Sequence, residues 1–338
     1  MAGLFRFTPG DIVISREEVV YAYRMILGRE PENEAVVAEQ VAGFGDLKSL
    51  RNGFLHSTEF LRQAVSLIGP EPVIPELQAE QPIDVACSPE QLKRLLASVE
   101  ATWSQLGKEE PYWSVLTSDR YRSENFSQNE DTYWSTGIVD VRRMKAWLER
   151  NGVASTARQR CLEYGCGTGR VTHWLAREFR QVTGCDITPA HLDLAQRAIS
   201  SRIEPSQEVD FFHVRNLKSL DRLPEFEFLF SFIVLQHNPP PVITYILDKL
   251  LARLAEGGIA FFQLPTYWKY YTFTTQAYLS RKAAVAGTDS QMEMHVVPQR
   301  YIFEIARRHG CKVLEVQPDG MASSREIVSH TFLLRKSS

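Results

Sequence analysis

The residues that point most directly to chemistry are two acids and three glycines near the middle of the chain. An apolar run ends on Glu163, and Gly165, Gly167 and Gly169 follow at alternate positions. Glycines arranged in this way after a strand let the backbone turn sharply and let a ligand approach the main chain, where a Cβ would clash. A second acid, Asp186, ends the next apolar run 21 positions after Gly165. This is close to the ~20-residue offset of a carboxylate that binds a ribose diol, so the pattern predicts a nucleoside site.

The order of these residues separates two kinds of nucleoside site. A dinucleotide fingerprint, Gly-x-Gly-x-x-Gly, would need its third glycine at Arg170. The observed order, acid-x-Gly-x-Gly-x-Gly, resembles motif I of the class I S-adenosylmethionine (SAM)-dependent methyltransferases, with Asp186 in the place of that family's ribose-binding acid. The resemblance implies SAM as the cofactor, and a carboxylate at Glu163 suits its positive groups. A glycine turn without a ligand and a nicotinamide or flavin site are the alternatives.

Around this motif, strand and helix patterns alternate as in a doubly wound, Rossmann-like α/β fold. Residues 158–338 are therefore predicted to form a seven-stranded methyltransferase sheet. The predicted strands cover 158–164, 181–187, 209–215, 226–235, 259–264, 311–317 and 326–335. The predicted helices cover 169–179, 189–200, 240–255 and 298–308. The last two strands form a hairpin, which matches the antiparallel end of the class I methyltransferase sheet.

Ligands of such sheets bind at the carboxyl ends of the strands, close to the switch between the first and the fourth strand. The resemblance implies further cofactor contacts there: Ile187 after the second strand, Asn216 and Leu217 after the third, and Phe232 and Gln236 at the fourth. Asn216 is expected to meet the adenine amino group, and Leu217 is expected to add apolar contact.

The segment 88–157 is predicted to cover this site. Ser88 and Pro89 start a helix, and aromatic residues are dense over 110–137, where weak periodicity suggests an ordered cover rather than a helix or a strand. A helix over 140–151 then leads into the first strand. Related methyltransferases fold this segment over the cofactor, which implies that three of its residues lie near SAM: Tyr133, Trp134 and Gly137. Aromatic side chains that merely plug the end of the sheet are the alternative.

Two histidines are candidates for a general base. His237, in the run Leu-Gln-His-Asn-Pro-Pro-Pro, is expected at the mouth of the cleft, where a neutral imidazole could take a proton from a hydroxyl or an amine. His295 lies in the segment 265–298, an aromatic-rich insertion that is expected to form a substrate cap and to stack on sugar rings. A polar filler at a helix start is the alternative for His237, and a cap without a ligand is the alternative for the insertion.

The Asn-Pro-Pro run at 238–240 resembles the Asn-Pro-Pro-aromatic signature of methyltransferases that act on amino groups. The next residue is Pro241 instead of an aromatic residue, so Asn238 is predicted to cap the helix that follows. The run Leu-Gln-His instead resembles the end of the fourth strand in small-molecule and glycan methyltransferases. This resemblance and the aromatic content of the insertion predict methyl transfer to a hydroxyl of a saccharide or a related small molecule. A SAM-binding scaffold protein of a glycan-assembly system and an N-methyltransferase are the alternatives.

Residues 1–68 are predicted to form a separate, all-helical domain, joined to the rest by a Pro-rich linker over 69–87. The run Tyr-Arg-Met-Ile-Leu-Gly-Arg-Glu-Pro at 23–31 and the residues at 54–60 resemble a short helical repeat of unknown function, found in bacterial proteins beside surface-glycan enzymes. The resemblance implies a role near glycan synthesis and a protein partner for these helices. A generic three-helix adaptor is the alternative.

Composition limits the remaining functions. With 338 residues, 44% hydrophobic and 23% charged, the chain is long enough for about two globular domains. A net charge of −3 argues against a nucleic-acid partner. The longest apolar run, 228–235, is too short to cross a bilayer, and the first residues do not read as a secretion signal. Five scattered cysteines and eight histidines without ligand spacing predict a cytoplasmic protein with reduced thiols and no metal site.

Overall fold

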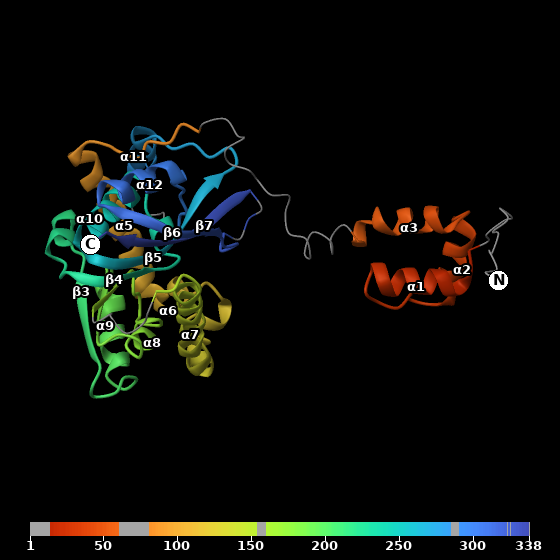
Figure 1. Ribbon diagram of the computed structural model, residues 1–338, viewed down its shortest axis with the longest axis horizontal. Helices are drawn as coiled ribbons and strands as arrows, with labels where there is room; N and C mark the ends of the chain where they lie inside the picture. Colours follow the sequence, from red (N-terminus) through yellow and green to blue (C-terminus); the bar gives the residue numbers. More distant parts are fainter. Residues whose placement is uncertain are drawn as a thin grey trace, which may run out of the picture. The chain divides into compact units, whose positions relative to one another are not determined.

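The computed structural model describes residues 14–60, 81–153, 160–284, 291–322, 324 and 326–337. The chain divides into two compact units, Met1–Ile74 and Pro75–Ser338 (Figure 1). Parts of four predicted segments lie outside the described residues: 1–13 and 61–68 of the helical domain, 69–80 of the linker, 154–159 before and within the first strand, and 285–290 of the insertion.

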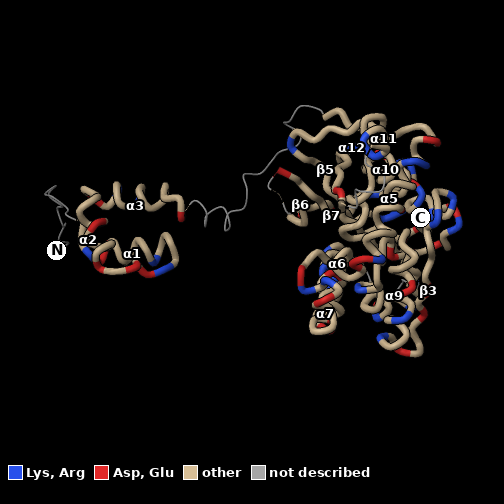
Figure 2. Tube along the Cα trace, turned by 180° about the vertical axis from the view of Figure 1, so that it is seen from behind, with Lys and Arg blue, Asp and Glu red and all other residues tan. Residues whose placement is uncertain are grey.

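Charged side chains are spread over both units. Figure 2 shows Lys and Arg interspersed with Asp and Glu along the chain. In the described ranges, no helix combines the length and the apolar character that crossing a membrane requires. Those ranges also hold no group of three or more His, Cys, Asp or Glu side chains that could bind a metal ion.

The described part of the N-terminal unit holds three helices whose starts are capped by side chains. They are α1 (Arg16–Ile26), α2 (Glu34–Gly43) and α3 (Leu47–Leu55). Ser15, Asn33 and Asp46 each accept a hydrogen bond from a backbone N–H of the first turn, which satisfies a donor that the helix itself leaves free. Tyr23 and Phe54 pack edge to face in the core, with 4.9 Å between ring centroids. The predicted helical character of this region is confirmed.

The described residues of the larger unit form a seven-stranded sheet with the order β3-β2-β1-β4-β5-β7-β6. Its strands are β1 (Arg160–Tyr164), β2 (Gln181–Asp186), β3 (Glu208–His213), β4 (Phe226–Ser231), β5 (Leu254–Trp268), β6 (Cys311–Pro318) and β7 (Ile327–Lys336). All neighbours are parallel except β7, which runs antiparallel to β5 and β6. The strand order reverses between β1 and β4, where connections diverge and leave room for a ligand. The predicted doubly wound α/β fold is confirmed.

Helices cover both faces of this sheet (Figure 1). They are α5 (Pro89–Glu109), α6 (Pro111–Val115), α7 (Phe126–Arg150), α8 (Thr172–Leu175), α9 (Pro189–Ile199), α10 (Pro240–Arg253), α11 (Thr275–Ala284) and α12 (Gln299–Arg308), with short 3₁₀ helices η2 (Asp119–Tyr121), η4 (Leu217–Arg222) and η5 (Leu235–His237). Apolar side chains of α5, α10 and α12 share one core with one face of the sheet. Those of α7 and α8 share a second core with the other face. Burial of these two layers holds the helices on the sheet.

One helix is longer than the sequence predicts. α7 begins at Phe126, whereas the prediction placed a non-helical cover over 110–137 and a helix over 140–151. Its buried residues recur at helical spacing from Phe126 to Leu148, so one continuous stripe faces the protein. Aromatic residues supply the first half of this stripe and aliphatic residues much of the second. Because the type of apolar residue changes along the helix, the common helical period was not recognised in the sequence.

Elements around the glycine loop also differ from the predicted bounds. The helix expected over 169–179 contains only the short α8, because the loop delays its start. β4 ends earlier than predicted, since Ile233 adopts a φ of 58° and breaks the strand. β5 continues to Trp268, so the predicted insertion 265–298 begins inside the sheet.

Candidate cofactor and acceptor site

A cavity of about 410 Å³ opens at the carboxyl ends of β1, β2 and β4. Small-molecule sites usually occupy ~300–1,000 Å³. Its wall contains many of the predicted site residues: Glu163, Gly165, Gly167, Asp186, Ile187, Phe232, Gln236 and His237. They come from three strands and the connections after them, so the reversal of strand order collects these residues around one space.

The bend after β1 leaves no room for side chains at two of its glycines. Gly165 has a φ of 79° and Gly167 a φ of 53°, in the left-handed region that glycine adopts most readily. A Cβ at Gly165 would lie 2.2 Å from Cγ1 of Val234, and one at Gly167 would lie 2.7 Å from Cγ2 of Val115. Both valines line the cavity, so the bend is packed into its wall. Gly169 does not line the cavity.

The carboxylate of Asp186 is fixed against this bend. Its Oδ2 accepts the N–H of Gly167 at 2.9 Å, and its Oδ1 accepts that of Thr188 at 2.8 Å. Burial by itself raises the pKa of Asp186, but the adjacent His191 ring and the two N–H donors outweigh burial and hold the pKa below its usual value. An ionised carboxylate has further lone pairs that can accept hydroxyl donors in the cavity.

Two ionisable groups in the wall lack full compensation. Glu163 is 3% exposed and accepts one hydrogen bond among the described residues, from Thr172 Oγ1 at 2.6 Å. Burial therefore raises its pKa to about 8. The Arg170 guanidinium pairs through Nη2 with Asp140 at 2.7 Å, but its buried Nε has no acceptor in the described part of the chain. A carboxylate without a cation and a guanidinium donor without an acceptor together complement a zwitterion.

His237, in η5, has one ring nitrogen available for chemistry. Its Nδ1 lies 2.8 Å from the backbone carbonyl of Glu293. Because a carbonyl only accepts, Nδ1 carries the proton, and Nε2, to which no described residue hydrogen-bonds, has the lone pair. The ring packs edge-on against Trp103, with 5.3 Å between centroids. Burial lowers the pKa of His237 to about 4, so the imidazole is neutral near pH 7.

The turn after β4 is held by side-chain amides. Ile233 has a left-handed φ of 58°, which is unfavourable for a β-branched residue, and its N–H donates to Oε1 of Gln263 at 3.1 Å. Gln263 in turn donates to Oε1 of Gln236 at 3.2 Å and to the hydroxyl of Ser329. Ile233 and Gln236 line the cavity, so this network fixes the wall between β4 and β5.

The α7 residues predicted near the cofactor support the glycine loop from behind instead. Tyr133, Trp134 and Gly137 do not line the cavity. The buried hydroxyl of Tyr133 lies 2.6 Å from Thr168 Oγ1 in the loop. At Gly137, α7 packs so closely on Arg170 that a Cβ would lie 2.2 Å from the backbone oxygen. These side chains therefore hold the loop in place and do not cover the cavity.

The residues predicted to contact adenine, Asn216 and Leu217, also lie away from the cavity. Asn216 is exposed and caps η4, since its Oδ1 accepts the N–H of Ser219 at 3.2 Å. The polar side chain is thus used by its own turn. The predicted cap of α10 is also wrong: Nδ2 of Asn238 donates to the Leu235 carbonyl at 3.2 Å, and α10 starts without a side-chain cap.

His295, the second candidate base, does not line the cavity. Its Nδ1 lies 2.7 Å from the Tyr271 hydroxyl and its Nε2 lies 3.3 Å from Oε2 of Glu293, so both ring nitrogens are engaged. The aromatic residues expected to stack on sugars do not line the cavity either: Tyr267, Trp268, Tyr270, Tyr271 and Phe273. The described part of the insertion contributes three other residues to the wall: Met292, Glu293 and Met294.

Much of the remaining wall comes from residues that the sequence analysis does not single out. They include Trp103, Ser114, Val115, Arg170, His191 and Met321. Ser114 and His191 are 77 positions apart, yet Oγ and Nε2 lie 3.0 Å from each other. No local motif marks such residues, because tertiary packing alone brings them to the cavity.

Comparisons with known proteins found the following similarities. Residues 161–258 match the methyltransferase domain family. A ubiquinone biosynthesis O-methyltransferase from Aromatoleum aromaticum is 26% identical over 166 residues, which cover 47% of this chain and 68% of the relative. A relative of the same name from Dechloromonas aromatica is 26% identical over 153 residues, which cover 43% of this chain and 62% of the relative. The solved structure of magnesium protoporphyrin IX methyltransferase from Synechocystis is 16% identical, with a TM-score of 0.48 over 72% of this chain and 100% of its own.

The matched residues run from β1 into β5 and include the glycine bend and Asp186. This segment is a methyltransferase domain. The chain is accordingly a SAM-dependent methyltransferase, with SAM as its cofactor. The predicted enzyme class and cofactor are confirmed.

Proposed function

We propose that this protein transfers the methyl group of SAM to a hydroxyl of a small-molecule acceptor, with His237 as the general base. The observation that carries the proposal is the state of this ring, which lines the cavity: Nδ1 donates to the Glu293 carbonyl, and the neutral imidazole keeps a lone pair on Nε2. A hydroxyl must lose its proton as it is methylated. The proton becomes strongly acidic as the oxygen bonds to carbon, so even a weakly basic imidazole can accept it.

The residues around the glycine bend fit SAM, which supplies a methyl group already activated on a sulfonium. We assign Glu163 to its ammonium, Nε of Arg170 to its carboxylate and Asp186 to its ribose diol. Glu163 is buried without a cation, Arg170 Nε is buried without an acceptor in the described residues, and Asp186 is ionised. Each group would gain a charge-assisted partner on binding, which supports this assignment.

The acceptor side of the cavity is mainly apolar. Its wall includes Val115, Leu116, Phe232, Ile233, Met292, Met294 and Met321. Such surfaces suit apolar or aromatic bodies, and methionine side chains adapt to their shape. We therefore favour an acceptor with an apolar body over the saccharide that the sequence predicts, because the aromatic residues expected to stack on sugars lie outside the cavity wall. The names of the two O-methyltransferase relatives support a hydroxyl acceptor.

Calorimetric titration with SAM, followed by transfer from isotopically labelled SAM to phenols, catechols and saccharides, tests this proposal. We expect SAM to bind and the label to appear as an ether methyl on phenolic acceptors, located by mass spectrometry and NMR. The His237→Ala variant should bind SAM normally and lose turnover. Label on amino groups would support the N-methyltransferase alternative, and absence of SAM binding at near-millimolar ligand would support the scaffold alternative.

For the N-terminal unit we keep the sequence hypothesis that it binds a protein partner, within a cytoplasmic system near glycan assembly. Two apolar side chains one turn apart on α1, Tyr21 and Met25, are 58% and 83% exposed and could contact such a partner. Cross-linking of the full chain in cells, compared with a Met25→Glu variant, tests this hypothesis. Identical cross-linked partners for both chains would contradict a role for this face.

A further inference from the structure

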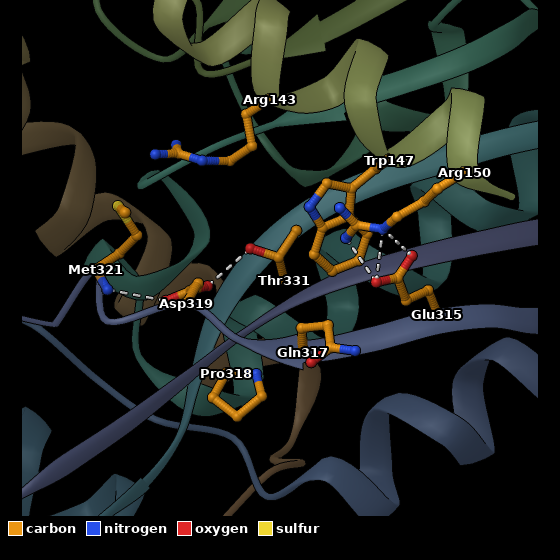
Figure 3. Close-up of a pocket in the computed structure, with 9 residues that line it drawn as sticks. All are labelled: Arg143, Trp147, Arg150, Glu315, Gln317, Pro318, Asp319, Met321 and Thr331. Carbon is orange, nitrogen blue, oxygen red and sulfur yellow. Dashed lines mark hydrogen bonds and ion pairs between the residues drawn. The ribbon is translucent and has the colours of Figure 1, made fainter. Parts of the chain in front are cut away.

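A second hollow adjoins the cavity described above (Figure 3). Its volume is about 640 Å³, and α7, β6, β7 and the connection between the two strands bound it. Trp147 and Arg143 contribute from α7, and Asp319 and Thr331 lie opposite them. Met321 lines both hollows, so this groove continues the acceptor side of the cavity.

Most charged groups of the groove are already paired. Arg150 binds Glu315 through two nitrogens, with N–O distances of 2.6 and 2.8 Å. Asp319 accepts hydrogen bonds from Thr331 Oγ1 at 2.8 Å and from the N–H of Met321 at 2.9 Å. Figure 3 marks these contacts with dashed lines. They fix the shape of the groove and occupy both of its carboxylates.

Arg143 differs from these groups. It shares one carboxylate with Arg170: its Nη1 lies 3.3 Å from Oδ1 of Asp140, and Nη2 of Arg170 lies 2.7 Å from Oδ2. Asp140 is therefore shared between two guanidinium groups, and Arg143 holds the longer of the two contacts. The Arg143 guanidinium also lies 4.8 Å from the ring centroid of Phe232, which lines the first cavity. Figure 3 shows it reaching across the groove toward Met321, with no dashed line to any residue drawn.

We propose that the groove binds a carboxylate of the methyl acceptor and that Arg143 is its partner. The inference rests on the proposed function and narrows the acceptor class to molecules with a hydroxyl, an apolar body and a carboxylate remote from the hydroxyl. The planar guanidinium fork of Arg143 matches a carboxylate.

Three catechols that differ in the charge of one substituent test this inference: 3,4-dihydroxycinnamate (anionic), 4-methylcatechol (neutral) and dopamine (cationic). For the wild type, kcat/KM should fall in that order. The Arg143→Gln variant should lose roughly 10–100-fold more in kcat/KM for the anionic catechol than for the neutral one, as expected for one charge-assisted pair. Arg143→Glu should reverse the order of the anionic and cationic catechols.

Arg142→Glu is the matched control, because Arg142 is the neighbouring, exposed residue of α7 and does not line the groove. It makes the same charge change and should keep the wild-type order. Calorimetric titration of 3,4-dihydroxycinnamate onto protein saturated with S-adenosylhomocysteine is the second readout, and only the Arg143 variants should raise Kd. Equal use of the three catechols, or equal losses in both Glu variants, would overturn the inference and leave the proposed function standing. Methylation of none of them would overturn both.

Discussion

The two walls of the cavity are built in different ways. The cofactor wall comes largely from one short stretch of sequence around Gly165 and Gly167, joined by a single 2.9 Å hydrogen bond to Asp186 on the next strand. The wall that we assign to the acceptor is assembled from α5, α6, η5 and the connections after β5 and β6, so that Trp103 and Met321 line one cavity although most of the domain's sequence separates them.

This difference follows from what each wall must bind. A cofactor that is always the same molecule can be bound by a local backbone bend and a few acidic side chains. An acceptor is instead selected by loops that come together from distant parts of the sequence. Changes in the cofactor wall should therefore alter SAM affinity with little effect on the choice of acceptor. Changes in the acceptor wall should alter turnover or selectivity and leave SAM affinity intact.

Replacing His237 by Ala should have the largest effect. Loss of a general base lowers kcat by about 10²–10⁴-fold, while calorimetric Kd for SAM should stay unchanged. Because the pKa of His237 is about 4, this group should leave the wild-type rate flat between pH 6 and 8 and reduce it only as the pH falls toward 4. His295→Ala is the control, since this ring does not line the cavity. An equal loss of kcat in both variants would contradict a specific role for His237.

The same contrast explains how much could be predicted from the sequence. The alternating pattern predicted the sheet. The spacing of Gly165 and Asp186 predicted that the glycine bend and this acid share one site, and both line one cavity, where the N–H of Gly167 in the bend donates to Asp186. Asn216 was misplaced because a short polar residue after a strand can equally well cap the next turn, as it does in η4. Tyr133 was misplaced because aromatic density alone does not say which side of a loop a helix packs on.

Gly165→Ala probes the steric part of the cofactor wall. The added Cβ would meet Val234 at 2.2 Å and would also impose a side chain at a φ of 79°. Strain and overpacking together should lower the free energy of unfolding by about 2–4 kcal/mol and weaken SAM binding. Gly152→Ala separates the two causes, since its φ is 63° but nothing lies within 4 Å of the added Cβ, so only about 1–2 kcal/mol is expected. If chemical denaturation showed the same loss of unfolding free energy for Gly165→Ala and Gly152→Ala, the contact of the added Cβ with Val234 would make no contribution.

Asp186→Ala tests the ribose assignment. Removing charge-assisted hydrogen bonds should weaken SAM binding by about 1.5–3 kcal/mol, with the KM for the acceptor unchanged at saturating SAM. Asp186 also accepts hydrogen bonds from the N–H groups of Gly167 and Thr188, so thermal unfolding of the variant must be measured as well. Asp186→Asn is the second variant, because it removes the charge and keeps the size of the side chain. A folded variant that binds SAM as tightly as the wild type would contradict the assignment.

SAM affinity should also depend on pH. Glu163 holds a proton below its pKa of about 8 in the free protein, whereas an ammonium would pair with its ionised form. Binding should therefore release a proton, and affinity should rise with pH up to about 8, by at most about tenfold per pH unit. Calorimetry in buffers of different ionisation enthalpy measures that proton, and Glu163→Gln should abolish both its release and the pH dependence.

The raised pKa of Glu163 also predicts how the free energy of unfolding changes with pH. Its carboxyl loses its proton near pH 4.5 in the unfolded chain and near pH 8 in the folded protein. Between these values the folded state binds more protons, so the free energy of unfolding should fall as the pH rises through this window. Glu163→Gln should flatten this fall, and saturating SAM should do the same if its ammonium compensates the ionised carboxylate. A pH profile of unfolding that is the same with and without SAM would show that the two groups do not meet, and the cofactor wall would then bind SAM by its backbone bend and Asp186 alone.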